Sequence, residues 1–93
     1  MYFRGGNRLQ PRLIDLRFDR VTCFVLPKRG VSVYNRPDGL DRFGGAYRLG
    51  TIPPELTIVQ TGADPTHFEI IPAHAMSLAD YELALAKITL TKV

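Results

Sequence analysis

The sequence has a single cysteine and no long apolar run, and these two absences exclude several classes of protein. Cys23 has no partner for an internal disulfide, so we expect a reducing compartment. No apolar run approaches the ~20 residues that a membrane-spanning helix needs. The first residues also contain no apolar segment of the kind found in Sec signal peptides. We therefore expect a cytoplasmic protein with no membrane partner.

Motifs of metal sites and of common nucleotide sites are also missing. His67 and His74 lie seven residues apart with no cysteine pair nearby, which matches no zinc spacing, so no metal is expected. The chain contains no P-loop, no motif of a nucleophile triad and no dinucleotide-binding glycine fingerprint. Any chemistry must therefore come from side chains that the fold brings together.

The composition is that of a folded protein with an uneven distribution of charge. A chain of 93 residues that is 45% apolar and 23% charged indicates one globular domain over residues 1–93. Residues 1–48 hold ten basic and four acidic residues, a net charge of +6, whereas the remainder has two basic and five acidic residues, a net charge of −3. Nine of the first ten cations are arginine, which pairs well with phosphate and carboxylate. This half favours an anionic partner: a nucleic acid, a nucleotide or an acidic protein.

Alternating and β-branched runs predict a sheet with one helix. Period-2 patterns and turn residues predict strands over Met1 to Arg4, Ile14 to Phe18, Val21 to Leu26, Val31 to Tyr34, Ala46 to Leu49, Leu56 to Gln60 and His67 to Ile71, and a helical turn over Leu40 to Phe43. Ser77 followed by Asp80 resembles a capping box, and apolar residues at helical spacing from Leu78 to Ile88 predict an amphipathic helix. We expect a strand-dominated α+β fold in which this C-terminal helix covers one face of the sheet.

Several polar residues fall inside the predicted strands, where a buried polar group must be satisfied or useful. If the strands that carry Arg4, Ser32, His67 and Glu69 converge, they form a cleft that suits a nucleotide. In such a cleft a guanidinium holds phosphate, a hydroxyl and an imidazole contact ribose, and an aromatic ring stacks on the base. The aromatic residues expected to line it are Tyr2, Phe24, Tyr34 and Tyr47.

Four segments carry a resemblance to a known family. They are Tyr2 to Arg4, Gly30 to Arg36, Pro53 to Leu56, and Asp64 to Ala73 with Met76. These segments resemble a family of small bacterial cytotoxins, known from type VI secretion effectors, whose fold is similar to that of ADP-ribosyltransferases. The strand that contains His67 is the most specific part. The chain departs from the family in being shorter between Arg4 and Gly30.

The resemblance implies a split β-sheet and a cleft that binds NAD as substrate. By position, Arg4 would contact the NAD phosphates, Ser32 would lie near the nicotinamide ribose, and His67 would line the same cleft. Glu69 is the candidate for the catalytic glutamate of the better-known transferases because it shares a strand face with His67, although the effectors keep no carboxylate there. The implied activity is ADP-ribosyl transfer to a macromolecular target or cleavage of NAD. A cognate immunity or antitoxin protein would neutralise it, in the producing cell or in a cell that receives the toxin.

Two other functions are compatible with the sequence. The arginine-rich first half suits a small nucleic-acid-binding β-domain, whose affinity falls linearly with log salt concentration. A toxin fold without catalysis, acting by protein contact alone, is the other.

Overall fold

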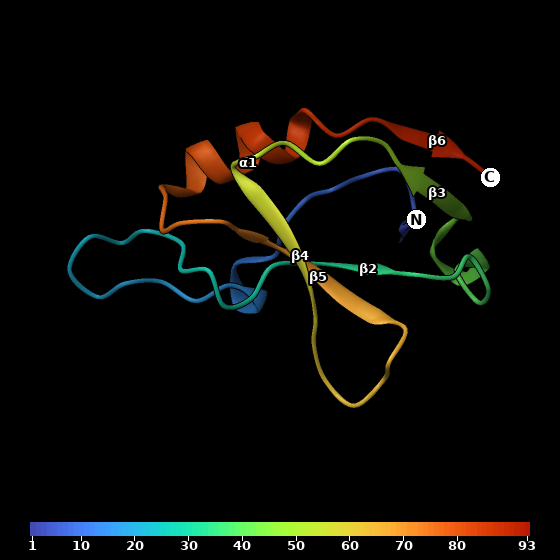
Figure 1. Ribbon diagram of the computed structural model, residues 1–93, viewed down its shortest axis with the longest axis horizontal. Coiled ribbons are helices and arrows are strands. Elements are labelled where there is room, and N and C mark those ends of the chain that lie inside the picture. The colour runs from blue at the N-terminus through green and yellow to red at the C-terminus, as the bar shows by residue number, and fades with distance from the viewer.

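Six strands form one antiparallel sheet in the computed structural model, which describes residues 1–93 (Figure 1). Their order across the sheet is β4-β5-β2-β1-β3-β6. The strands are β1 (Phe3–Gly5), β2 (Val31–Tyr34), β3 (Ala46–Leu49), β4 (Leu56–Gln60), β5 (His67–Pro72) and β6 (Leu90–Lys92); one α-helix, α1 (Leu78–Ala86), and two 3₁₀ turns, Leu13–Asp15 and Asp41–Phe43, complete the elements. The predicted α+β class and the predicted single helix are confirmed.

The helix α1 covers one face of the sheet and closes the core. The Ser77 hydroxyl accepts a hydrogen bond from the Asp80 amide at 3.1 Å, so the predicted cap starts the helix. The apolar face of α1 then packs on the sheet. Buried residues of this core include Val31, Val33, Leu49, Leu56, Ile70, Tyr81, Ala84, Leu85 and Ile88. At nine residues, α1 is too short to cross a membrane, and no other α-helix is present.

The alternation of β2 sends its polar side chains to the face away from α1. Val31 and Val33 are buried in the core, so Ser32 and Tyr34 point to the opposite face. The register with β5 pairs Ser32 with Glu69 and Tyr34 with His67. Because directly opposed residues share a face of the sheet, these four side chains lie together.

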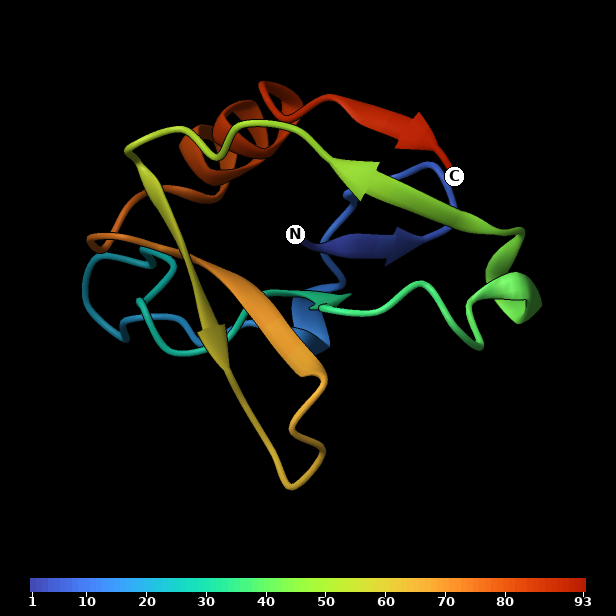
Figure 2. The same cartoon turned by 45° about the vertical axis from the view of Figure 1, so that its right-hand side comes forward.

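The sheet has two halves, β4-β5-β2 and β1-β3-β6, that meet at a narrow joint. Only one residue pair, Phe3 and Tyr34, joins β1 to β2. Figure 2 shows β4 and β5 running at a marked angle to β1, β3 and β6. Next to this joint a side chain takes the place of the backbone hydrogen bonds between β1 and β2. The Arg4 guanidinium donates from Nη1 to the Ser32 carbonyl at 2.7 Å. The joint therefore brings a cation from β1 beside the middle of β2.

The Tyr81 side chain also replaces a backbone hydrogen bond of the sheet, at the point where β2 begins beside β5. The Tyr81 hydroxyl donates to the Ile70 carbonyl at 2.5 Å and accepts from the Val31 amide at 3.2 Å. A Cβ atom on Gly30 would lie 1.9 Å from the Ile70 carbonyl oxygen, so only glycine fits there. Burial raises the pKa of Tyr81 to about 12, which keeps this hydroxyl protonated.

The two strands predicted over Ile14 to Phe18 and Val21 to Leu26 are wrong. The first segment begins in the 3₁₀ turn Leu13–Asp15, and Ile14 is 80% exposed. The second belongs to a protruding loop in which Asp19 Oδ1 accepts from the amides of Val21 and Thr22, at 2.8 and 2.9 Å. This local turn satisfies the backbone without a strand partner. Only isolated bridges remain, and they pair Val25 with Phe18 and with Met76.

Candidate functional site

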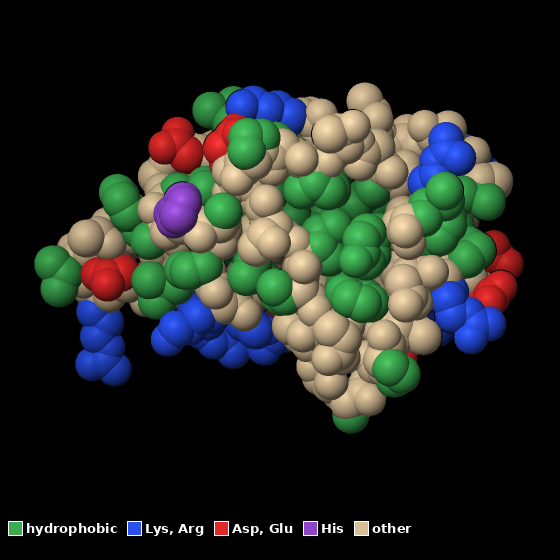
Figure 3. Space-filling view, in the orientation of Figure 1, with side chains coloured by type: hydrophobic (Ala, Val, Ile, Leu, Met, Phe, Trp, Pro, Cys, Tyr) green, Lys and Arg blue, Asp and Glu red, His purple; other side chains and the backbone are tan.

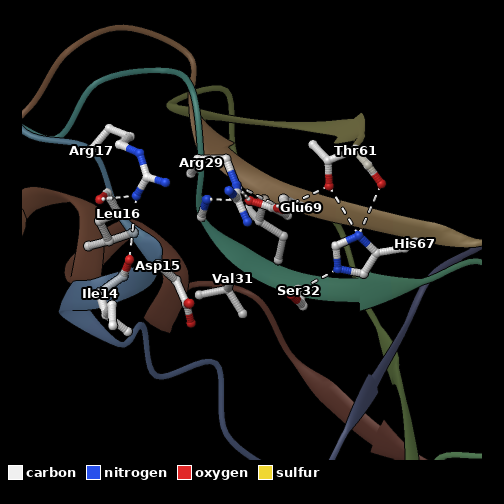
Figure 4. Close-up of polar contacts among 12 residues, drawn as sticks. Ile14, Asp15, Leu16, Arg17, Arg29, Val31, Ser32, Thr61, His67 and Glu69 are labelled. Atoms are coloured by element: carbon white, nitrogen blue, oxygen red, sulfur yellow. Dashed lines mark hydrogen bonds and ion pairs between the residues drawn. The ribbon is translucent and has the colours of Figure 1, made fainter. Parts of the chain in front are cut away.

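A line of hydrogen bonds crosses the polar face of the sheet from β2 to β5 (Figure 4). Ser32 Oγ lies 3.0 Å from His67 Nε2. The other ring nitrogen, His67 Nδ1, lies 3.1 Å from Thr61 Oγ1 and 3.2 Å from the Thr61 carbonyl. Thr61 Oγ1 donates to Glu69 Oε2 at 2.7 Å, and Arg29 Nε donates to Glu69 Oε1 at 2.9 Å. The line therefore runs from a hydroxyl through an imidazole and a second hydroxyl to an ion pair.

The partners of His67 determine which of its nitrogens carries the proton. A carbonyl oxygen can only accept, and the single proton of the Thr61 hydroxyl is already donated to Glu69. Both partners of Nδ1 therefore require a proton on Nδ1. In the neutral imidazole, Nε2 is then the acceptor and the Ser32 hydroxyl donates to it. Ser32 and His67 thus have the orientation of a nucleophile and a general base.

Glu69 anchors the far end of the line. Its side chain is 1% exposed, and its carboxylate also accepts from the Gly30 amide at 2.8 Å. Burial by itself raises the pKa of Glu69, but the hydrogen bonds from Arg29, Gly30 and Thr61 outweigh it and lower the pKa below the ordinary value. Glu69 is therefore ionised at neutral pH, which makes it an acceptor for Thr61.

Arg4 approaches β2 from the neighbouring strand β1. It is half-buried, and burial lowers its pKa, although an arginine in a protein keeps its charge. Its Nε donates to the Arg8 carbonyl at 2.9 Å and its Nη1 to the Ser32 carbonyl at 2.7 Å. Two of its five N–H groups are thus used within the chain, and the remaining donors suit an anion.

A cleft of about 350 Å³ lies at the joint between the two halves of the sheet. This volume is within the range of small-molecule sites, ~300–1,000 Å³. One wall is β2 with Arg4, and the segment 10–15 with Phe43 forms other parts of the lining. The polar and aromatic side chains of the lining are Arg4, Gln10, Arg12, Asp15, Ser32, Tyr34 and Phe43. Arg12 forms an ion pair with Asp15 at 2.8 Å, whereas Arg4 donates only to carbonyl oxygens, so Arg4 is the lining cation whose charge has no ion-pair partner.

The structure brings together four of the residues that the sequence singled out. Arg4 contacts the Ser32 backbone, and the Ser32 side chain contacts His67. Tyr34 lines the cleft, and its ring stands edge-on to His67, with 5.4 Å between centroids. His67 lies behind Ser32 and is not part of the cleft lining.

Other expectations about the site differ from the structure. Glu69 is fully engaged and buried, so it does not face the cleft as the carboxylate of a ribosyl-transfer site would. Three aromatic residues lie outside the cleft. Tyr2 packs edge-on against Phe68 with 5.1 Å between ring centroids, Phe24 belongs to the protruding loop, and Tyr47 lies on β3 beneath Lys92.

Sequence reasoning missed Thr61, Arg29 and Asp15. Thr61 directly follows β4, and its amide donates to the His67 carbonyl at 3.3 Å, which fixes it beside the imidazole. A threonine at the end of a strand that precedes a histidine-bearing strand was the available signal. Asp15 is the one carboxylate among the lining residues, and its position depends on the turn that the sequence did not reveal.

Comparison with known proteins finds no relative. No family model matches the sequence, and neither the curated proteins nor the solved structures contain a match.

Proposed function

We propose that the protein is an NAD-consuming cytotoxin that cleaves the nicotinamide–ribose bond and releases the ADP-ribosyl group to water or to a macromolecule. The observation that supports this most is that Arg4 and Ser32 meet at one cleft and that His67 contacts the Ser32 side chain from behind, so that three strands contribute. The narrow joint of the sheet, with its cleft, agrees with the split β-sheet that the resemblance to the type VI cytotoxins implies.

The lining suits the parts of a dinucleotide. Arg4 has free donors for the pyrophosphate, and the ring of Tyr34, which lines the cleft, suits a flat nitrogen ring. Ser32 Oγ has lone pairs for a ribose hydroxyl in addition to the proton it shares with His67. These contacts would hold the glycosidic bond in one place, which is the first requirement for breaking it.

Departure of nicotinamide leaves positive charge on the ribose, and a carboxylate must offset it. Since Glu69 is buried, we assign this role to Asp15, the carboxylate of the cleft lining. Its two hydrogen bonds with the Arg12 guanidinium, at 2.8 and 3.2 Å, fix its position. Electrostatic stabilisation of this kind is a large term in enzyme catalysis.

Nicotinamide release from NAD tests the activity. We expect the wild-type protein to release nicotinamide, and Arg4→Ala, Ser32→Ala and His67→Ala each to lower the rate by at least ~10²-fold. Arg48→Ala, which removes an exposed arginine of β3, is the matched control and should retain full activity. A wild-type protein that neither binds NAD in a calorimeter nor releases nicotinamide would remove the enzymatic proposal.

The toxic role is tested by expression in a bacterium that lacks the protein's genomic neighbours. We expect growth arrest by the wild-type chain, relief by co-expression of the cognate immunity protein, and loss of toxicity in Arg4→Ala. Arrest that persists without Arg4 and His67 would favour a toxin that acts by protein contact alone.

One observation favours nucleic acid as a second candidate. Basic side chains gather on one side of the protruding loop of residues 17–29, where Arg17, Arg20 and Lys28 are exposed (Figure 3). Such a patch would bind phosphate with an affinity whose logarithm falls linearly with log salt. No binding to an RNA or DNA oligomer at low salt would exclude this candidate.

A further inference from the structure

The contacts of Ser32 carry an inference beyond substrate binding. In the neutral imidazole, His67 Nε2 has no proton, and the Ser32 hydroxyl donates to it at 3.0 Å. A serine that shares its proton with an oriented imidazole is the arrangement of an activated nucleophile. Ser32 lines the cleft whereas His67 does not, so the imidazole reaches a bound molecule through the serine oxygen.

We infer that Ser32 is a nucleophile, that His67 is its general base, and that Ser32 accepts the ADP-ribosyl group from NAD. This inference rests on the proposed function for the identity of its substrate. In the first step Ser32 Oγ forms a bond to C1 of the nicotinamide ribose. The bond from C1 to the nicotinamide nitrogen breaks and its electrons leave with neutral nicotinamide. The Ser32 proton passes to His67 Nε2, so charge and atoms balance.

A second step restores the protein. The protonated His67 donates its Nε2 proton to Ser32 Oγ as the bond from Oγ to C1 breaks. Water, or a hydroxyl of a target molecule, forms the new bond to C1 and loses its proton to solvent. The sum of the two steps with water is NAD⁺ and water giving ADP-ribose, nicotinamide and one proton.

Thr61 and Glu69 are positioning residues in this scheme. Glu69 accepts the hydrogen bond of the Thr61 hydroxyl, so the lone pairs of the Thr61 oxygen accept from His67 Nδ1. This keeps the lone pair of the imidazole on Nε2, toward Ser32, as second-layer partners of a catalytic histidine do. The Arg4 bond to the Ser32 carbonyl fixes the backbone of the nucleophile.

Labelling with a fluorophosphonate tests the nucleophile without NAD. Ser32 Oγ would attack phosphorus, fluoride would leave, and His67 would take the proton. The chain has only two serines, and Ser77 is the matched internal control because its hydroxyl caps α1 and forms no hydrogen bond with a histidine. We expect mass spectrometry to find the label on Ser32 and not on Ser77. Equal labelling of both serines, or none on either, would overturn the inference.

Two variants test whether Ser32 is labelled because His67 activates it or only because its hydroxyl is exposed. His67→Gln keeps a side chain of similar length on β5 and should slow labelling of Ser32 by at least ~10²-fold, because general-base catalysis contributes ~10²–10⁴-fold. Thr61→Val removes the hydroxyl at nearly constant shape and should slow it by a smaller factor, ~10-fold. Circular dichroism confirms that each variant is folded. Labelling that is unchanged in a folded His67→Gln would contradict the role of the imidazole.

Acid quenching during the reaction with NAD tests the covalent step. We expect ADP-ribose on the peptide that contains Ser32, and none on Ser32→Ala. Nicotinamide release without any modified Ser32 would overturn the inference while leaving the proposed function in place. Absence of nicotinamide release would overturn the proposed function and the ribosyl transfer with it, and fluorophosphonate labelling would still decide whether Ser32 is an activated nucleophile.

Discussion

Replacing Glu69 should affect both stability and the site, because this side chain connects β5 to the start of β2 and to Thr61. Glu69→Ala removes the acceptor of the Gly30 amide and of the Thr61 hydroxyl. Each unsatisfied buried donor costs about 1–3 kcal/mol, toward the lower end for the half-buried Thr61. Arg29 is 43% exposed, so the ion pair itself contributes only about 0–1 kcal/mol.

The one lost methylene group, Cγ, adds about 0.8 kcal/mol of apolar burial. We therefore expect Glu69→Ala to lower the free energy of unfolding by about 3–5 kcal/mol. A domain of this length has about 5–14 kcal/mol in total, so the loss is large. Glu69→Gln keeps the shape and one acceptor oxygen, and should lose about 1–2 kcal/mol.

Urea unfolding followed by far-UV circular dichroism measures these losses. Glu82→Ala, which removes an exposed carboxylate of α1, is the control and should change stability by less than about 0.5 kcal/mol. A Glu69→Ala protein as stable as Glu82→Ala would refute the buried network.

The wild-type protein and Glu69→Gln also give a pH test. Because hydrogen bonds hold the pKa of Glu69 below its ordinary value of 4.5, its ionised form stabilises the fold fully above that pH. This contribution is lost as pH falls through the folded-state pKa. The stability difference between wild type and Glu69→Gln should therefore shrink as pH falls below about 4.5, and a difference that grows would contradict the assigned sign.

Three further substitutions test the joints of the sheet and the helix cap. Gly30→Ala should lower the free energy of unfolding by more than about 3 kcal/mol, because its Cβ would lie 1.9 Å from a backbone oxygen of β5. Gly62→Ala is its control: the new Cβ would meet open space, and only the positive φ should lower the free energy of unfolding, by about 1–2 kcal/mol. Tyr81→Phe should cost about 1–3 kcal/mol because it leaves a buried amide and carbonyl without their bridging hydroxyl, whereas Tyr47→Phe should be nearly neutral. Ser77→Ala should cost about 1 kcal/mol through loss of the cap. Urea unfolding measures all five, and a Gly30→Ala protein as stable as Gly62→Ala would contradict the close approach.

The elements that the sequence predicted well are those whose pattern and packing agree. Val31 and Val33 alternate with polar residues over a strand that does pack on a helix, so β2 and its faces were predictable. The same alternation over Ile14 to Phe18 was misleading, because Asp19 closes a turn that leaves no neighbouring strand. The short edge strand β6 carries too few residues for a period-2 pattern, and it was missed.

The site was predictable in part for the same reason. Ser32 and His67 were placed on one face because both lie in regular strands. Thr61 and Arg29 lie in loops and Asp15 in a 3₁₀ turn, and their positions depend on tertiary contacts that no local pattern records. The burial of Glu69 also depends on partners that come from distant segments.

The proton arrangement of His67 connects the fold to the proposed chemistry, and ¹⁵N NMR of the imidazole measures it directly. At a pH where the ring is neutral, we predict a proton on Nδ1 and an unprotonated Nε2 that accepts from Ser32. A ring that carries its proton on Nε2 would contradict the account, because Ser32 would then face a donor and would have no base.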